Sequence, residues 1–266
     1  MDRKIFTETS PHTTRTYADE VLCTALDIGE SLLECGAEIQ RVEDTIQRIC
    51  FSYGADHVEV FAITAMITAS VRMPDGDYAS QMRRVYGSSN DFRKLEDLNA
   101  LSRTVCKEPP SIETVQKRIH EIRYPEKQKP WTVYFGALIA TSAFAIFFGG
   151  NWKDAVASGL IGLLMQILGT TLLSQTGPFA KTLVSSFVGG LLAELAVFMI
   201  PGMNVDKIMI ATIMLLIPGG AFCNSLRDLF SGDTFAGSAR LVQSILLALT
   251  IASGFSIAIL LFGGVV

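Results

Sequence analysis

The chain has 266 residues, 49% of them hydrophobic, and its 22 basic and 26 acidic side chains give a net charge of −4. It has no basic stripe interleaved with aromatic residues, which excludes a typical nucleic-acid-binding surface. The charge is unevenly placed, because only 10 of the 48 charged residues follow Trp131. The composition therefore predicts an ordinary soluble first half and a hydrophobic, membrane-embedded second half.

The first part of the chain predicts a flexible tail and then a small domain of helices and strands. Residues 1–15 are polar and include no apolar run, so we expect no cleavable signal peptide. Apolar side chains recur at helical spacing over 17–34 and 39–53, and a glycine follows each helix. Residues 57–61 alternate, residues 62–73 are rich in Ile, Thr and Val, and a strand at 78–86 follows a turn at 74–77, which predicts a small antiparallel sheet.

Two more predicted helices, at 92–106 and 111–122, complete an N-terminal α+β domain over residues 16–124. Residues 125–130 carry basic side chains and two prolines, and they form the predicted linker to a transmembrane domain at 131–266. Because Lys and Arg concentrate before the first apolar run, we expect the N-terminal domain to be cytoplasmic.

Five apolar runs follow, and we predict about five transmembrane helices, one of them broken. Four runs are long enough to span a bilayer, at 131–148, 155–173, 183–200 and 241–262. The run at 208–217 is short and ends at Pro218-Gly219-Gly220. A buried core helix is the alternative for so short a run, but its membrane neighbours favour a broken or re-entrant segment. Five spans place the C-terminus outside the cell, and four place it inside.

The strongest candidate site is the polar stretch after this break. Asn224, Arg227 and Asp228 share a helical face, and Asp233 and Arg240 follow. Ionisable groups next to membrane helices usually face a cavity or each other, and a guanidinium suits a carboxylate. We therefore predict that these five residues bind a small zwitterionic or anionic substrate. The alternative is a cytoplasmic loop whose charges cap helices and set topology.

Two further places carry candidate residues. Glu194 lies in an otherwise uncharged run, and a carboxyl group in a dry environment holds its proton tightly, which suits proton coupling. Its alternative role is a pair with a neighbouring helix or a partner subunit. In the soluble domain, Glu38, Arg41 and Glu43 follow a glycine break, and Glu38 and Arg41 can pair along the helix. A helix start with solvated charges is the simpler interpretation of this motif.

Other classes of site find little support in the sequence. The five cysteines and three histidines are scattered, so we predict no metal site and no cofactor. The chain lacks a P-loop motif, which argues against ATP-driven transport by this chain, and no catalytic constellation can be argued from spacing. We therefore expect that the protein is not an enzyme.

The ordered motifs resemble the threonine/serine exporter family over roughly residues 17–262. The resemblance rests on Gly36-Ala37-Glu38 with Arg41-Val42-Glu43, Arg123-Tyr124-Pro125, Gly150 to Asp154, and Pro218 to Arg240. It implies a multi-pass plasma-membrane exporter of small polar metabolites. It also implies that this chain is the longer half of a transporter whose second, smaller membrane subunit is a separate chain.

From the residues and the resemblance together we predict one subunit of a secondary exporter of L-threonine and L-serine, driven by the proton motive force. Self-association is a further expected partnership. A dicarboxylate exporter subunit, for succinate, is the alternative. A membrane-anchored sensor or scaffold with a ligand-binding cytosolic domain is a second alternative, which the size of the N-terminal domain motivates.

Overall fold

The computed structural model describes residues 16–87, 91–125 and 130–262. The predicted tail at 1–15 and most of the predicted linker at 125–130 lie outside these ranges. The chain forms two compact units, Met1–Pro125 with Asn224–Ser238, and Glu126–Cys223 with Ala239–Val266. The first unit thus combines the N-terminal residues with a short segment from late in the chain. The division into domains at 16–124 and 131–266 stays a prediction.

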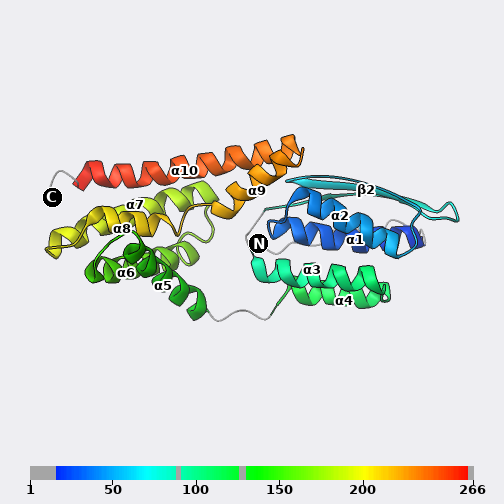
Figure 1. The fold of residues 1–266 in the computed structure, drawn as a ribbon, viewed down its shortest axis with the longest axis horizontal. Helices are drawn as coiled ribbons and strands as arrows, with labels where there is room; N and C mark the ends of the chain where they lie inside the picture. The colour runs from blue at the N-terminus through cyan, green and yellow to red at the C-terminus, as the bar shows by residue number, and fades with distance from the viewer. Residues whose placement is uncertain (1–15, 88–90, 126–129, 263–266) are drawn as a thin grey trace. The chain divides into compact units, whose positions relative to one another are not determined.

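The first unit is built in three layers, which Figure 1 shows as sheet, inner helices and outer helices. The strands pair antiparallel in the order β1-β2-β3. Helices α1 and α2 cover one face of the sheet, and α3 and α4 pack on the other side of these helices. The element bounds are α1 (Tyr17–Glu34), α2 (Ile39–Ser52), β1 (His57–Ile63), β2 (Met66–Arg72), β3 (Tyr78–Arg84), α3 (Phe92–Lys107) and α4 (Ile112–Arg123). The predicted helices are confirmed to within one residue at each end.

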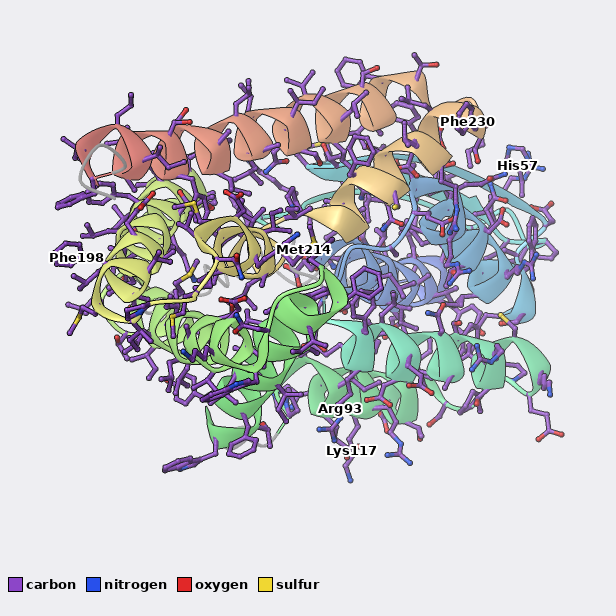
Figure 2. All side chains as sticks on the ribbon, turned by 60° about the vertical axis from the view of Figure 1, so that its left-hand side comes forward. His57, Arg93, Lys117, Phe198, Met214 and Phe230 are labelled. Atoms are coloured by element: carbon purple, nitrogen blue, oxygen red, sulfur yellow. The ribbon has the colours of Figure 1, made fainter. Side chains whose placement is uncertain are left out.

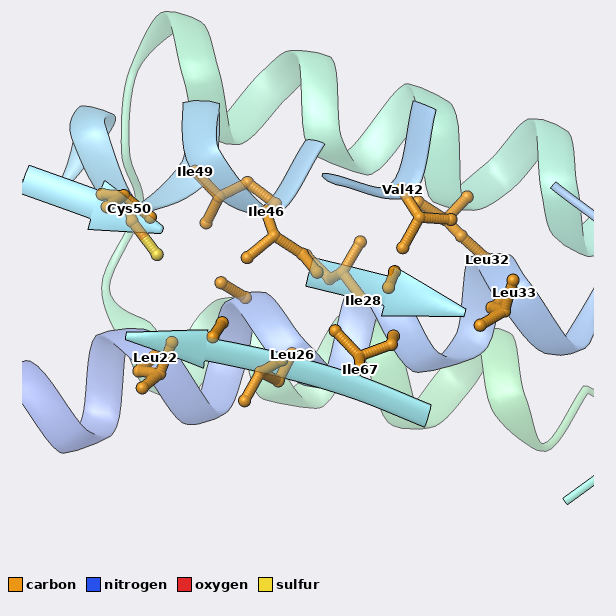
Figure 3. Packing of buried hydrophobic residues seen from close by; sticks show 14 of the residues in the cluster. Leu22, Leu26, Ile28, Leu32, Leu33, Val42, Ile46, Ile49, Cys50 and Ile67 are labelled. Carbon is orange, nitrogen blue, oxygen red and sulfur yellow. The ribbon is translucent and has the colours of Figure 1, made fainter. Parts of the chain in front are cut away.

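Helix α1 lies at the centre of this unit, and 11 of its 18 residues are buried. Leu22, Leu26 and Leu32 are fully buried beside residues of α2 and β2, as Figure 3 shows. A Cβ added at Gly29 would lie 2.5 Å from Cδ1 of Ile46, so α1 and α2 are packed closely at this point. On β2 every second residue is buried, which is the period expected for a sheet covered on one face.

Arg123 fastens the end of α4 to α1. Its Nε donates to Oγ of Ser31 at 2.7 Å, and its Nη2 donates to the carbonyl oxygen of Asp27 and the carboxylate of Glu30, both at 2.9 Å. The sequence placed this arginine at the boundary before the apolar runs. It is also a half-buried structural contact of the first unit, whose first segment ends two residues later at Pro125.

The second unit is helical. It contains α5 (Pro130–Phe147), α6 (Trp152–Thr170), α7 (Pro178–Met199), α8 (Val205–Ile213), the start of α9 (Gly219–Phe230) and most of α10 (Thr234–Phe262). The predicted interruption is confirmed, because α8 ends at Ile213 and α9 begins directly after Pro218. By length and hydropathy alone, two of the described helices could cross a membrane, α7 and α10. The apolar part of α5, Trp131–Phe147, is shorter than these two helices.

Large apolar side chains cover much of the outside of this unit. Phe198, labelled on α7 in Figure 2, exposes 64% of its surface. Exposed leucine, isoleucine or phenylalanine residues also occur on α5, α6 and α10. A surface this apolar is unusual for a soluble monomer and suits contact with lipid.

Glycines let the helices of this unit approach each other closely. A Cβ at Gly162 of α6 would collide with Thr141 of α5. A Cβ at Gly254 of α10 would collide with Ser186 of α7 and lie 2.9 Å from the carbonyl oxygen of Leu183. Close approach through small residues is the usual way in which membrane helices pack. These glycines therefore serve packing and are not merely tolerated.

We predict that Gly254→Ala destabilises the protein, whereas Gly136→Ala does not. Alanine is the better helix former by about 1 kcal/mol, and open space surrounds Gly136. At Gly254 the new methyl group meets the backbone of α7, and such overpacking costs about 1–3 kcal/mol. The thermal midpoints of the purified full-length variants in detergent measure the difference. An unchanged midpoint for Gly254→Ala would contradict the close contact of α7 with α10.

Candidate functional site

The site begins at the turn that joins α1 to α2. Gly36 adopts a positive φ of 85°, which L side chains rarely tolerate, and the N–H of Ala37 donates to the carbonyl oxygen of Leu32. Glu38 occupies the N-cap position of α2, but its side chain makes no capping hydrogen bond there. The first N–H groups of α2 therefore need an acceptor from elsewhere.

Helix α9 supplies this acceptor from far along the sequence. Oδ1 of Asp228 accepts a hydrogen bond from the N–H of Ile39 at 3.3 Å, and Asp228 is only 1% exposed. One turn earlier, Nδ2 of Asn224 donates to the carbonyl oxygen of Gly36 at 2.8 Å. A carboxylate at a helix N-terminus is favoured both by the free N–H groups and by the helix dipole.

An ion pair completes the contact, between the guanidinium of Arg227 and the carboxylate of Glu38. The Arg227 side chain is 62% exposed and that of Glu38 is 21% exposed. Solvent screens such a pair, so it contributes at most about 1 kcal/mol. We call the contact of Gly36, Glu38 and Ile39 with Asn224, Arg227 and Asp228 the α9 clamp. Asp228 is its buried member.

The start of α10 adds an apolar contact to the same unit. Ala236 is 3% exposed and belongs to the hydrophobic core formed by α1, α2 and the sheet. A Cβ added at Gly237 would lie 2.7 Å from Cγ of Leu229 and 3.0 Å from the carbonyl oxygen of Ser225, so α9 and α10 turn tightly around each other here. The segment Asn224–Ser238 is thus held by polar contacts and by core packing together.

Glu43 of α2 is a second acidic residue on which the segment Asn224–Ser238 acts, through the negative charge of Asp233. Oε1 of Glu43 accepts from the N–H of Ala62 at 2.7 Å. Burial raises the pKa of the Glu43 carboxyl above its ordinary value, the hydrogen bond from Ala62 opposes this, and the charges of Asp233 and Asp44 raise it further. Glu43 therefore holds its proton more readily than an ordinary surface carboxyl group.

The structure thus brings together residues from the two motifs that the sequence singled out separately. Glu38 meets Arg227, whereas the sequence allowed a pair with Arg41 along the helix. Arg41 instead points to the outer face of α2, where it lines a groove against α3. Arg240 belongs to the second unit, outside the α9 clamp.

Glu194 also belongs to the second unit, and it is 5% exposed on α7. Helix α7 begins five residues before the predicted run, so Glu194 lies in the last third of the helix. The negative charge of Asp206, at the start of α8, repels a negative charge on Glu194. In the same unit Oγ of Ser158 is buried and has no hydrogen-bond partner among the described residues.

Asp154 is a structural residue to which the sequence analysis gave no role. It is fully buried, and its carboxylate accepts from the N–H of Asn151, from the N–H of Asn204 and from Nδ2 of Asn204, at 2.8–3.0 Å. Nδ2 of Asn151 donates to the carbonyl oxygen of Gly202 at 2.8 Å. These bonds join the loop before α6 to the loop before α8. The spacing of Asn151 and Asp154, a capping box at a helix start, was the available signal.

Comparison with known proteins gives a consistent set of relatives. The family described as "Putative threonine/serine exporter" matches residues 24–262. A "Probable threonine/serine exporter" of Mycobacterium tuberculosis is 24% identical over 91% of this chain and 46% of its own length. A "Threonine/serine exporter" of Corynebacterium glutamicum is 22% identical over 90% of this chain and 50% of its own length.

A different relative matches over nearly its whole length. The "Probable succinate transporter subunit YjjP" of Escherichia coli is 25% identical over 90% of this chain and 93% of its own length. The chain therefore spans about half of the threonine/serine exporters that it matches and almost all of the YjjP subunit. No solved structure matches the chain.

We predict that Asp228→Ala lowers the free energy of unfolding by about 1–3 kcal/mol, because it leaves the buried N–H of Ile39 without this acceptor. Glu121→Ala is the matched control. It removes a carboxylate whose pair with Arg118 is solvent-exposed, and it costs less than about 1 kcal/mol. Urea unfolding of the full-length protein, followed by the fluorescence of a probe on the first unit, measures both. Equal effects would contradict the capping role of Asp228.

We also predict that Glu43 makes the stability of the folded protein depend on pH. Its pKa in the folded state lies above the ordinary value of 4.5, so between the two values the folded state binds more protons than the unfolded state. The stability that Glu43 contributes is therefore complete below that ordinary value and is lost as the pH rises through the folded pKa. Glu43→Gln retains an acceptor for Ala62 and removes the titration. Its urea midpoints between about pH 4 and about pH 7 should fall less than those of the wild type. Parallel curves would contradict the raised pKa.

Proposed function

Because the chain belongs to the threonine/serine exporter family, we propose that it is one subunit of a secondary active exporter of small polar metabolites, with L-threonine and L-serine as its substrates. The family match over residues 24–262 carries the proposal. The interrupted α8–α9 segment supports it, because broken membrane helices free backbone groups that can bind small ions and carboxylates. In this proposal the proton motive force drives export.

The lengths of the relatives support a two-chain organisation. YjjP is named as a transporter subunit, and this chain matches it almost end to end. The threonine/serine exporters extend beyond the matched region by about as much again. We propose that a second, smaller membrane subunit supplies the corresponding half, in addition to any self-association of this chain.

The proposed topology has five spans and a cytoplasmic N-terminal unit in the plasma membrane. The segments 16–125 and 224–238 belong to one compact unit, so an even number of crossings must separate Pro125 from Asn224. Helices α5, α6 and α7 with the broken α8–α9 segment give four, and α10 gives the fifth. Basic residues before α5, such as Arg118 and Arg123, support the cytoplasmic side for this unit.

The proposed substrate-binding residues are Asn224, Arg227, Asp228, Asp233 and Arg240. In the described state Asn224, Arg227 and Asp228 hold the α1–α2 turn, and Arg227 is bound by the Glu38 carboxylate. We propose that the carboxylate of a substrate replaces Glu38 on Arg227, whose planar fork accepts two oxygens. Glu194, buried in the second unit, is the proposed proton-coupling residue.

Succinate is the second candidate substrate, and one observation favours it. The relative that this chain matches almost end to end is named as a succinate transporter subunit. A short dicarboxylate offers Arg227 the same carboxylate group as an amino acid does. The substrate-binding residues therefore accommodate either class, and transport assays must separate them.

The proposal predicts export from membrane vesicles. Vesicles that contain the full chain, alone and together with its proposed partner subunit, are loaded with labelled threonine, serine or succinate. We expect efflux of threonine and serine that stops when a protonophore collapses the proton gradient. Efflux of succinate alone would favour the dicarboxylate reading. No efflux of the three compounds, with or without the partner, would refute the transport function.

A charge exchange tests the role of Arg227. If Arg227 binds substrate, Arg227→Ala abolishes threonine export, Glu38→Ala retains it, and the double exchange Glu38→Arg with Arg227→Glu does not restore it. If the pair is only structural, both alanine variants lose export equally and the exchange restores it. Membrane insertion of each variant, measured by surface labelling, is the control. The second pattern would contradict substrate binding by Arg227.

A further inference from the structure

A polar groove lies between α2 and α3 and borders the α9 clamp at Glu38. It has a volume of about 450 Å³. Each helix contributes residues at spacings of 0, 3, 4 and 7, which form one stripe along its surface. The stripes are Arg41, Asp44, Thr45 and Arg48 on α2, and Asn99, Ser102, Arg103 and Cys106 on α3. Every one of these side chains is polar or a cysteine, whereas helix interfaces are usually apolar.

Positive charge is in excess in this groove. Arg48 has an ion pair with Asp44 at 4.0 Å. Within the part of the chain that the structure describes, neither Arg41 nor Arg103 has a carboxylate within 4.0 Å of its guanidinium. Glu38 lines one end, but its charge is matched by Arg227. Two guanidinium groups from different helices thus share the groove without an ion pair of their own among the described residues, although Asp44 and Glu38 also line it.

Mixed charges on exposed helix faces are common, and a solvated face is the simpler interpretation of either stripe alone. A solvated face does not explain the two stripes together, because they line one groove and each helix contributes an arginine without an ion pair to any described residue. Both arginines are exposed, and an anion placed between their two guanidinium groups would be attracted by both charges. The volume falls within the range of small-molecule sites.

We propose that the groove binds a short dicarboxylate. One carboxylate group would bind the Arg41 guanidinium and the other the Arg103 guanidinium, each through two parallel hydrogen bonds. Asn99 adds a neutral hydrogen-bonding group. This site lies on the N-terminal unit and is separate from the proposed substrate-binding residues, so it goes beyond the proposed export function. It makes the N-terminal unit a receptor for a small acidic metabolite.

Cys106 offers a local probe of this site. It is exposed and lines the groove. Burial raises the pKa of its thiol, and the positive charge of Arg48 opposes this. Cys223 is also exposed but does not line the groove. The rate at which neutral N-ethylmaleimide alkylates each cysteine of the purified full-length protein can be followed by mass spectrometry of the peptides. A ligand in the groove should slow Cys106 and leave Cys223 unchanged.

We expect succinate to slow alkylation of Cys106 by about fivefold or more at saturation, and uncharged succinamide to have no effect. Arg41→Gln and Arg103→Gln should each raise the succinate concentration for half-protection by about tenfold. Arg118→Gln, at an exposed arginine outside the groove, should leave it unchanged. Far-ultraviolet circular dichroism confirms the fold of each variant.

Three results would overturn the proposal. Absence of protection by succinate would exclude the site. Protection that Arg41→Gln and Arg103→Gln leave unchanged would place the bound succinate elsewhere. Equal protection by inorganic phosphate would show a general anion site and refute the dicarboxylate assignment. These measurements detect binding alone, so a failure of export in vesicles would leave them intact, and the reverse also holds.

Discussion

The first unit depends on one constraint: the N–H groups at the start of α2 need hydrogen-bond acceptors from outside the helix. A helix leaves its first N–H groups without partners, and Glu38 does not cap α2 with its side chain. The acceptor is the buried carboxylate of Asp228, 189 residues later in the chain. Because a buried unpaired donor is costly, this bond ties a late segment to an early helix. Asn224, Arg227 and Ala236 reinforce the same attachment.

This attachment constrains the helices that lie between. The chain leaves the first unit after Pro125 and must re-enter it at Asn224. Helix α8 has nine residues and a length of about 14 Å, less than half of a bilayer core. In the proposed topology a crossing at this point needs α8 together with the residues of α9 before Asn224, and the break before Pro218 lies inside it. The interruption and the α9 clamp are thus consecutive parts of one path through the fold.

Local features of the fold could be predicted from the sequence, and long-range ones could not. Helix ends follow from caps and periodicity, so α1 and α2 were placed to within one residue. Pro218 and the two glycines after it predict the break between α8 and α9. The pairing of Glu38 with Arg227 has no local signal, because any carboxylate on the surface of the unit could have met that arginine. The role of Asp154 was missed for the same reason. Its capping box is visible in the sequence, but its bonds to Asn204 join loops that are 50 residues apart.

The position of Ala236 has a consequence for the order of folding. Residues 16–125 leave the ribosome first, yet the core of their unit includes Ala236 and the cap of α2 needs Asp228. The first unit is therefore incomplete until the chain has been synthesised past residue 238. Contacts of such high sequence separation form late, because loop closure is entropically costly. In the proposed five-span topology, completion of the N-terminal unit thus depends on correct insertion of the helices between Pro125 and Asn224. A chain threaded with the wrong number of crossings would carry Asp228 to the opposite side of the membrane and leave α2 uncapped.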